Sequence, residues 1–184
     1  MFKFRRMRSM DPLQVAMTGV RMGERYLQVF CSDVTLTRGL ASKTGLSGVA
    51  ALAAADLAQA ARARSAASKA GALIDVRVVQ SPILPSDWTS FDMVVIDETG
   101  GSFSALSTLD RRALMDALKQ VLRDGGRVEI IERTGGGLLG GSSPAPASYS
   151  ADGGAEGVLR QASFNPVRTL AERDGFRFVE GLRG

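Results

Sequence analysis

Histidine is absent from this 184-residue sequence, and cysteine occurs once, as Cys31. The usual transition-metal ligands are therefore nearly missing, and the chain cannot form an internal disulfide framework or a cysteine zinc site. Catalytic triads built on histidine are excluded for the same reason. We expect no metal site, and any catalysis would have to use carboxylates, lysine, tyrosine, the thiol or positioning alone.

Long apolar runs and aromatic rings are also scarce. The sequence contains no stretch of about 18 apolar residues, the length that a membrane span needs. No apolar run of signal-peptide length follows the first basic residues. With a single cysteine, this favours a cytoplasmic location. One Trp and two Tyr provide few rings for stacking on bases, which argues against a nucleic-acid partner.

The positive charge is concentrated at the start of the chain. Six basic and two acidic residues among positions 1–25 account for the whole net charge of +4. The first eight residues, MFKFRRMR, interleave apolar and basic side chains, a pattern that suits an anionic membrane surface or an acidic protein partner. The candidate contact residues are Phe2, Lys3, Phe4, Arg5, Arg6 and Arg8. The alternative is a solvated N-terminal tail.

Apolar runs alternate with helical patterns through the rest of the chain. Strands are expected over residues 26–31, 49–55, 74–79, 91–96 and 127–131. The helical patterns after these strands include residues 57–70 and 109–122. Such alternation is typical of a parallel sheet with right-handed crossovers. We therefore expect a basic arm and leading helix over 1–24, followed by one α/β domain over 25–184.

Two later segments depart from this alternation. Residues 134–157 are rich in Gly, Ser and Pro and contain few large apolar residues, so we expect a loop there. Asp174-Gly175 lies between two apolar runs and predicts a closing antiparallel hairpin.

The turn after the first strand is unusual for a ligand-binding fold. Between Phe30 and Val34 there is no glycine, although glycines normally let such a turn bend sharply and approach a ligand. Ser32 or Asp33 can instead cap the helix that follows. Cys31 in the same turn would be a buried filler or, with a lowered pKa, a reactive thiol.

The phrases SFDMVVI at 90–96 and LKQVLRDGGRVEIIE at 118–132, with the closing hairpin, resemble the class I S-adenosylmethionine-dependent methyltransferases. The resemblance extends from about Glu24 to the C-terminus. It implies a Rossmann-like doubly wound, mostly parallel α/β sheet closed by a C-terminal antiparallel hairpin. These phrases carry the fold and say little about chemistry.

The cofactor motif of that family is altered here. The acid that usually ends the first strand is matched by Gln28, and the three turn glycines are matched by Phe30, Ser32 and Val34. A β-carbon in a left-handed backbone conformation costs about 1–2 kcal/mol. Phe30 and Val34 would also take space where the methionine part of the cofactor lies in the family.

The remaining family positions are mixed. Asp56 matches the acid that holds the cofactor ribose, and it would serve equally well as the N-cap of the helix from Leu57. The adenine-binding Gly-Asp is replaced by residues 80–82. If S-adenosylmethionine binds, the contact candidates are Asp56, Cys31 and Ser32.

Asp97 and Glu98 end the fourth strand, where some members of the family place substrate-contacting residues. Adjacent strand residues point to opposite faces, so these two acids do not form a dyad. Asp97 is a weak candidate for a general base, and the alternative is a solvated strand end.

The sequence therefore favours a methyltransferase-like protein without catalysis and without a cofactor. In this interpretation it is a structural or accessory subunit of a larger protein assembly, with an anionic membrane surface as one place for its arm. The alternative is an active S-adenosylmethionine-dependent methyltransferase with an atypical cofactor loop.

Overall fold

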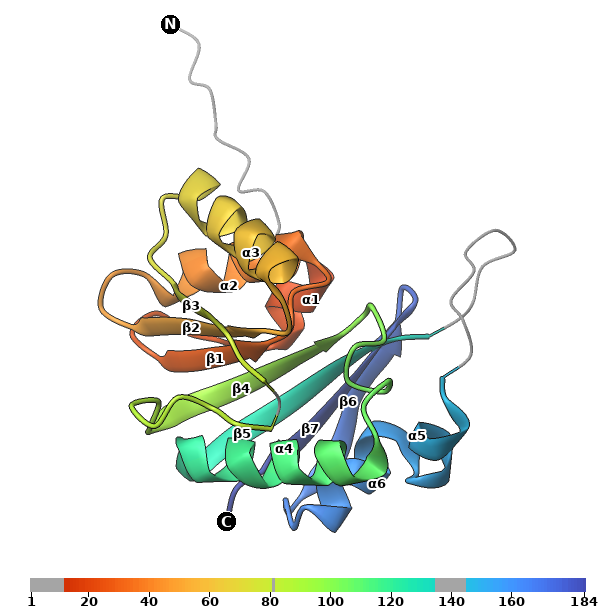
Figure 1. Cartoon of the computed structure of the whole chain (residues 1–184). Coiled ribbons are helices and arrows are strands. Elements are labelled where there is room, and N and C mark those ends of the chain that lie inside the picture. Colours follow the sequence, from red (N-terminus) through yellow and green to blue (C-terminus); the bar gives the residue numbers. More distant parts are fainter. Residues whose placement is uncertain (1–11, 81, 135–144) are drawn as a thin grey trace, which may run out of the picture.

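The structure, a computed structural model, describes residues 12–80, 82–134 and 145–184. Within them, seven strands form one sheet with the order β3-β2-β1-β4-β5-β7-β6 (Figure 1). The strands are β1 Arg25–Val29, β2 Val49–Ala54, β3 Asp75–Val78, β4 Phe91–Glu98, β5 Leu122–Arg133, β6 Val167–Arg173 and β7 Phe176–Leu182. The helices are α1 Leu13–Met17, α2 Val34–Thr44, α3 Leu57–Lys69, α4 Thr108–Val121, α5 Ala147–Ala151 and α6 Gly154–Gln161.

The sheet has the predicted mixed architecture. Strands β1 to β5 pair in parallel, whereas β7 pairs antiparallel with both β5 and β6. The hairpin turns at Asp174 and Gly175, whose φ angles are 53° and 78°. These left-handed values are those of the tight turn that Asp-Gly favours. The predicted doubly wound sheet with a closing antiparallel hairpin is therefore confirmed.

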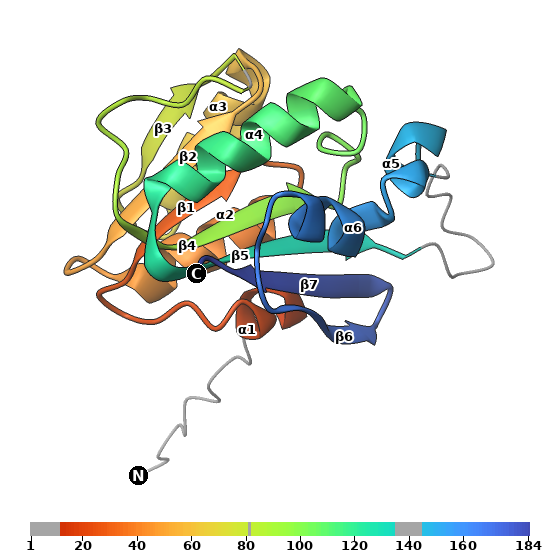
Figure 2. The ribbon, with the colours of Figure 1, turned by 90° about the horizontal axis from the view of Figure 1, so that it is seen from below.

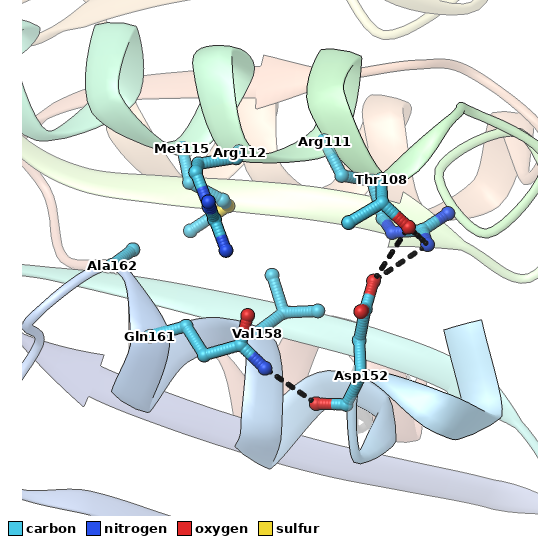
Figure 3. A pocket seen from close by; sticks show the side chains of 8 residues that line it. All are labelled: Thr108, Arg111, Arg112, Met115, Asp152, Val158, Gln161 and Ala162. Carbon is cyan, nitrogen blue, oxygen red and sulfur yellow. Dashed lines mark hydrogen bonds and ion pairs between the residues drawn. The ribbon is translucent and has the colours of Figure 1, made fainter. Parts of the chain in front are cut away.

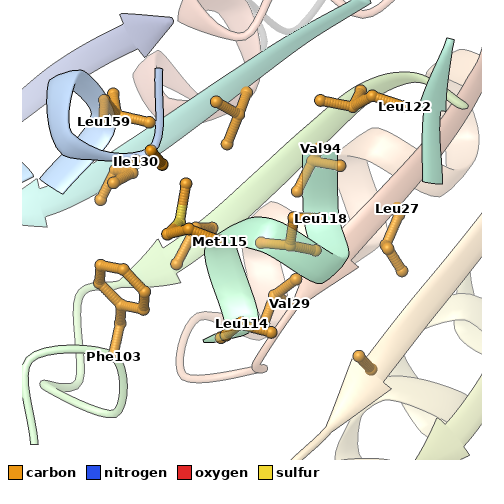
Figure 4. Close-up of a cluster of buried hydrophobic side chains, with 14 of the residues drawn as sticks. Leu27, Val29, Val94, Phe103, Leu114, Met115, Leu118, Leu122, Ile130 and Leu159 are labelled. Atoms are coloured by element: carbon orange, nitrogen blue, oxygen red, sulfur yellow. The ribbon is translucent and has the colours of Figure 1, made fainter. Parts of the chain in front are cut away.

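Helices cover both faces of the sheet (Figures 1 and 2). On one face, α1 and α2 contribute Val15, Leu36 and Leu40 to a cluster with Tyr26 and Val95. On the other, leucines and a methionine of α4 pack with α6 against alternate residues of β1, β4 and β5 (Figure 4). Side chains alternate between faces along a strand, so each strand supplies both clusters.

The leading helix lies on a face of the sheet. Val15 of α1 is buried, and a β-carbon on Gly39 of α2 would come within 2.4 Å of its side chain. The lack of a side chain at Gly39 therefore permits the close contact between α1 and α2. The contact residues predicted in the basic arm, Phe2 to Arg8, lie outside the described residues.

The prediction of a loop over 134–157 is wrong for residues 147–151 and from Gly154 onward, which are helical. Residues 147–151 form α5, and α6 begins at Gly154. Tyr149 is buried, and its ring and that of Phe103 form a T-shaped pair. A single buried aromatic residue therefore anchors a segment whose composition indicated a loop. Of this stretch, residues 135–144 are not described.

No helix in the described part of the chain is long and apolar enough to cross a membrane.

Candidate functional site

The carboxyl edge of the sheet is the place to look for a ligand. Strand β1 lies between β2 and β4, so the connections leave β1 and β4 in opposite directions along the sheet. In open α/β sheets, ligands bind beside the carboxyl ends of the strands at this reversal point. The turn from β1 to α2 and the end of β4 form this edge.

Phe30 adopts a backbone conformation that glycine usually supplies. Its φ is 67°, in the left-handed region, and its side chain is 3% exposed within the main core cluster. The backbone N–H of Phe30 donates to the Ala53 carbonyl at 2.8 Å, and its carbonyl accepts from Gln28 Nε2 at 2.9 Å. The turn geometry is therefore retained without glycine, at a cost of about 1–2 kcal/mol.

Asp97, at the end of β4, binds the backbone of this turn. Its Oδ2 accepts from the N–H groups of Ser32 at 2.7 Å and Asp33 at 2.8 Å. Its Oδ1 accepts from the Thr99 N–H at 3.2 Å and the Thr99 hydroxyl at 2.6 Å. Asp97 is fully buried, so the interpretation of this residue as a solvated strand end is wrong. A general base would need access to a substrate proton, and both Asp97 oxygens are occupied by donors of the chain itself.

The segment after β4 lies directly on the turn. A β-carbon built on Gly100 would come within 2.4 Å of Ser32 Oγ and 2.8 Å of Ser32 Cβ. Only glycine can make so close an approach without displacing its neighbour. Ser32, a candidate for cofactor contact, is therefore in contact with the chain's own backbone at position 100.

Helix α3 closes the turn from the side of β2. Gln59 is buried, and its Oε1 accepts from the N–H groups of Cys31 at 3.0 Å and Ala55 at 3.3 Å. Arg62, one turn along, donates from Nη2 to the Cys31 carbonyl at 3.0 Å. The sequence analysis missed Gln59 because its partners are separated from it in the sequence, and no local motif indicates where its side chain reaches.

The backbone donors from Phe30 to Asp33 are consequently satisfied within the chain. The N–H groups from Phe30 to Asp33 donate to Ala53, Gln59 and Asp97. Asp33 Oδ1 accepts from the N–H groups of Thr35 and Leu36, which confirms Asp33 as the N-cap of α2. A ligand carboxylate at this turn would have to displace one of these acceptors.

Asp56 and Cys31 have structural roles in the turn region. Asp56 is exposed and caps α3, its Oδ1 accepting from the Gln59 N–H at 2.7 Å. Cys31 is buried with its Sγ 3.3 Å from the Thr37 hydroxyl, and burial raises the pKa of its thiol. A raised pKa disfavours the thiolate, so the interpretation of Cys31 as a buried filler fits and a reactive thiol does not. Val34 is 41% exposed at the start of α2, so it does not fill the turn from inside.

A second polar cluster lies at the carboxyl ends of β4 and β5. Glu98 and Glu132 are neighbours in the parallel register. Glu98 Oε2 accepts from the Phe103 N–H at 2.7 Å, and Glu132 Oε1 accepts from the Tyr149 hydroxyl at 2.7 Å. Burial raises the pKa of Glu98, and the charge of Glu132 adds to this rise. Both acids thus hold the segments that cover this edge.

Arg111 of α4 also binds the segments that cover the carboxyl ends of β4 and β5. Its guanidinium is buried and pairs with Asp152 at 2.7 Å (Figure 3). It also donates to the carbonyls of Ser104 and Leu106. The small pocket beside this ion pair is lined mainly by α4 and α6 (Figure 3). Arg111 therefore joins α4, the segment after β4, and the end of α5. In the part of the chain that the structure describes, no three acidic or cysteine side chains are grouped to hold a metal ion.

Sheet order, crossovers and closing hairpin together define the fold of the class I S-adenosylmethionine-dependent methyltransferases. A methyltransferase from Aquifex aeolicus described as SAM-dependent superposes with a TM-score of 0.75 at 17% identity, covering 92% of this chain and 87% of that one. A SAM-dependent O-methyltransferase from Thermotoga maritima gives 0.65 at 15%, covering 92% and 62%. A TehB-like SAM-dependent methyltransferase from Corynebacterium glutamicum gives 0.63 at 12%, covering 93% and 86%. No family model and no curated protein matches the sequence.

The turn that the resemblance matches to the cofactor loop is bonded to side chains of the chain itself. Asp56 remains at the end of β2, where the resemblance implies a ribose contact. The N–H groups of Ser32 and Asp33 donate to Asp97, and Gln59 accepts from N–H groups of the turn and of the segment after β2. The chain thus shares the fold of these neighbours, and the N–H groups of its turn from Phe30 to Asp33 are bonded to acceptors of the chain itself.

Proposed function

We propose that this chain is a methyltransferase-fold protein that acts as a non-catalytic binding subunit. The observation that carries the proposal is the double hydrogen bond from the Ser32 and Asp33 N–H groups to Asp97. These bonds support the proposal because a buried carboxylate of the chain already uses two backbone donors that a ligand at this turn would need.

Energetics make this arrangement hard to reverse. A hydrogen bond to a charged group contributes about 1.5–3 kcal/mol, and Asp97 accepts four such bonds. A ligand carboxylate entering the turn would also lie close to the Asp97 charge, and like charges repel strongly where water is excluded. Cofactor binding would therefore require the end of β4 to rearrange.

A second candidate function is that of a S-adenosylmethionine-dependent methyltransferase with an atypical turn. The likeness to solved methyltransferases, taken alone, favours this candidate over the first. Asp56 supports it too, since an exposed carboxylate remains at the end of β2. In this case Asp97 would have to release the turn when the cofactor arrives.

Calorimetric titration with S-adenosylmethionine decides between the two. For the binding subunit we expect no heat of binding up to about 1 mM ligand, which corresponds to less than about 4 kcal/mol of binding free energy. The Asp56→Ala variant provides the control, because it removes the remaining candidate for ribose contact. A micromolar dissociation constant that is lost in Asp56→Ala would establish the second candidate instead.

The basic arm is proposed as a contact element of the subunit. Residues 1–8 interleave Phe2, Phe4 and Met7 with four cations. Deleting residues 1–9 should weaken sedimentation with phosphatidylglycerol vesicles or with the protein partner. Unchanged association in both assays would leave the arm as a solvated tail.

A further inference from the structure

An open groove runs between α2 and α3. Its volume is about 490 Å³, within the range of sites that bind ligands. Its lining includes three cations, two hydroxyls and three apolar side chains. The lining residues are Val34, Thr35, Arg38, Ala61, Arg62, Ser65, Ala66 and Lys69.

The groove has a single sign of charge. Helices α2 and α3 contain five basic residues and no acidic residue. The acids nearest in sequence, Asp33 and Asp56, are occupied as the N-caps of the two helices. No ion pair involves Arg38, Arg62 or Lys69 in the described part of the chain, although acidic residues neutralise cations elsewhere on the surface.

The cations are spaced for a linear anion. Arg62 and Lys69 lie seven residues apart on α3, which places them about 10 Å apart along one face of the helix. Arg38 stands on the opposite wall, on α2. Carboxylates two turns apart on one face of a helix have about the same separation.

From this charge complementarity we infer that the groove between α2 and α3 binds an acidic peptide segment of a partner protein. Both helices contribute cations to the groove, and Val34, Ala61 and Ala66 contribute apolar side chains. A flat lipid surface would contact the rims of a groove and leave its interior empty, whereas a peptide can fill it. Burial of these apolar side chains would add to the electrostatic attraction.

This inference rests on the proposed function as a binding subunit, because it names the surface and the chemistry of the partner. The groove shares two residues with the turn region, Val34 and Arg62. Arg62 lines the groove and also donates to the Cys31 carbonyl of the turn. Test variants are therefore best placed at Arg38 and Lys69, which leave the turn intact.

The experiment measures fluorescence anisotropy with the full chain and a labelled synthetic peptide. The peptide carries glutamates at positions i, i+3 and i+7 with leucine and alanine between them, and a matched peptide has glutamines instead. We expect the acidic peptide to bind and the Arg38→Gln/Lys69→Gln double variant to weaken it about fivefold or more. The control double variant Arg112→Gln/Arg173→Gln removes the same charge from exposed positions on α4 and β6. It should change the affinity less than about twofold, as expected for charges outside the contact.

Three outcomes would overturn the inference. The first is an equal loss in both double variants, which would indicate attraction by net charge alone. The second is a groove-dependent loss seen with phosphatidylglycerol vesicles but not with the peptide, which would assign the surface to a membrane. The third is complete competition by inorganic phosphate at physiological ionic strength, about 0.15 M, which would indicate a small-anion site. A calorimetric S-adenosylmethionine titration of the same protein tests the proposed function separately, so failure of one can be told from failure of the other.

Discussion

Two buried carboxyl groups on neighbouring strands differ in their hydrogen bonding. Asp97 of β4 and Glu129 of β5 lie on the same face of the sheet, because Asp97 pairs with Ile131 and Val95 with Glu129. Both are 0% exposed. Asp97 accepts four hydrogen bonds, whereas neither oxygen of Glu129 has a hydrogen-bond partner among the described residues.

The difference shows what each acid does for the protein. Burial raises the pKa of Glu129 to about 8, and the charge of its cross-strand neighbour Glu180 adds to this rise. Glu129 is thus mainly protonated at neutral pH and acts as a polar filler of the core. Asp97 accepts from four donors and holds the turn between β1 and α2 against the end of β4. One acid orders a turn, and the other costs stability as the pH rises.

Removing the first carboxylate should have the largest effect. Asp97→Ala leaves two N–H groups of the turn and two donors of Thr99 without their acceptor. We expect a loss of several kcal/mol in the free energy of unfolding, measured in urea, because each buried donor left without an acceptor costs about 1–3 kcal/mol. The matched control is Asp124→Ala, whose side chain is 89% exposed and which should change stability by less than about 0.5 kcal/mol. Similar losses in both variants would show that Asp97 does not hold the turn.

Glu129 predicts that the stability of the fold changes with pH in the opposite direction to that expected from ordinary surface acids. The folded protein retains the Glu129 proton to about pH 8, while the unfolded chain releases it in the usual range of about 4–5. Stability should therefore fall as pH rises between about 5 and 8, by up to about 1.4 kcal/mol per pH unit.

Glu129→Gln removes this titration and keeps the shape of the side chain. The urea concentration at the unfolding midpoint should depend less on pH in the variant than in the natural chain. The difference in stability between the two, in favour of the variant, should grow towards pH 8. Parallel pH profiles for the two proteins would show that Glu129 is ionised in the folded state.

The turn itself can be tested with a pair of substitutions at Phe30. Alanine and glycine both remove the buried ring, and they differ only in the β-carbon at a φ of 67°. Phe30→Gly should therefore be more stable than Phe30→Ala by about 1–2 kcal/mol in urea unfolding. Equal stability would mean that the backbone relaxes once the ring is gone, and that Asp97 and Gln59 do not impose the conformation.

The hairpin gives the smallest expected effect. Asp174 also has a positive φ, but at an exposed turn where Asp is tolerated. Asp174→Gly should change the unfolding free energy by no more than about 0.5 kcal/mol. A loss above about 1 kcal/mol would reveal a side-chain role for Asp174 beyond its turn conformation.

The fold could be predicted far better than the site. Apolar runs, Asp174-Gly175 and the caps Asp33 and Asp56 are local signals, and each has the structure expected from it. The segment 147–157 was missed, since one buried Tyr149 outweighs a composition rich in Gly, Ser and Ala. Asp97 was misplaced at the solvated end of a strand, because the pattern of β4 does not show that a turn 65 residues earlier would supply its donors.

The sequence by itself determined the order of the strands and of the helices before residue 134, the closing hairpin and the absence of glycine from the turn after β1. These follow from periodicity and from the conformational limits of single residues, which act over a few positions. Only the tertiary structure decided that Asp97 and Gln59 meet the turn and that Glu129 is buried with no hydrogen-bond partner in the described part of the chain. Such pairings depend on which strands become neighbours, and side-chain reach across elements leaves no pattern in the chain.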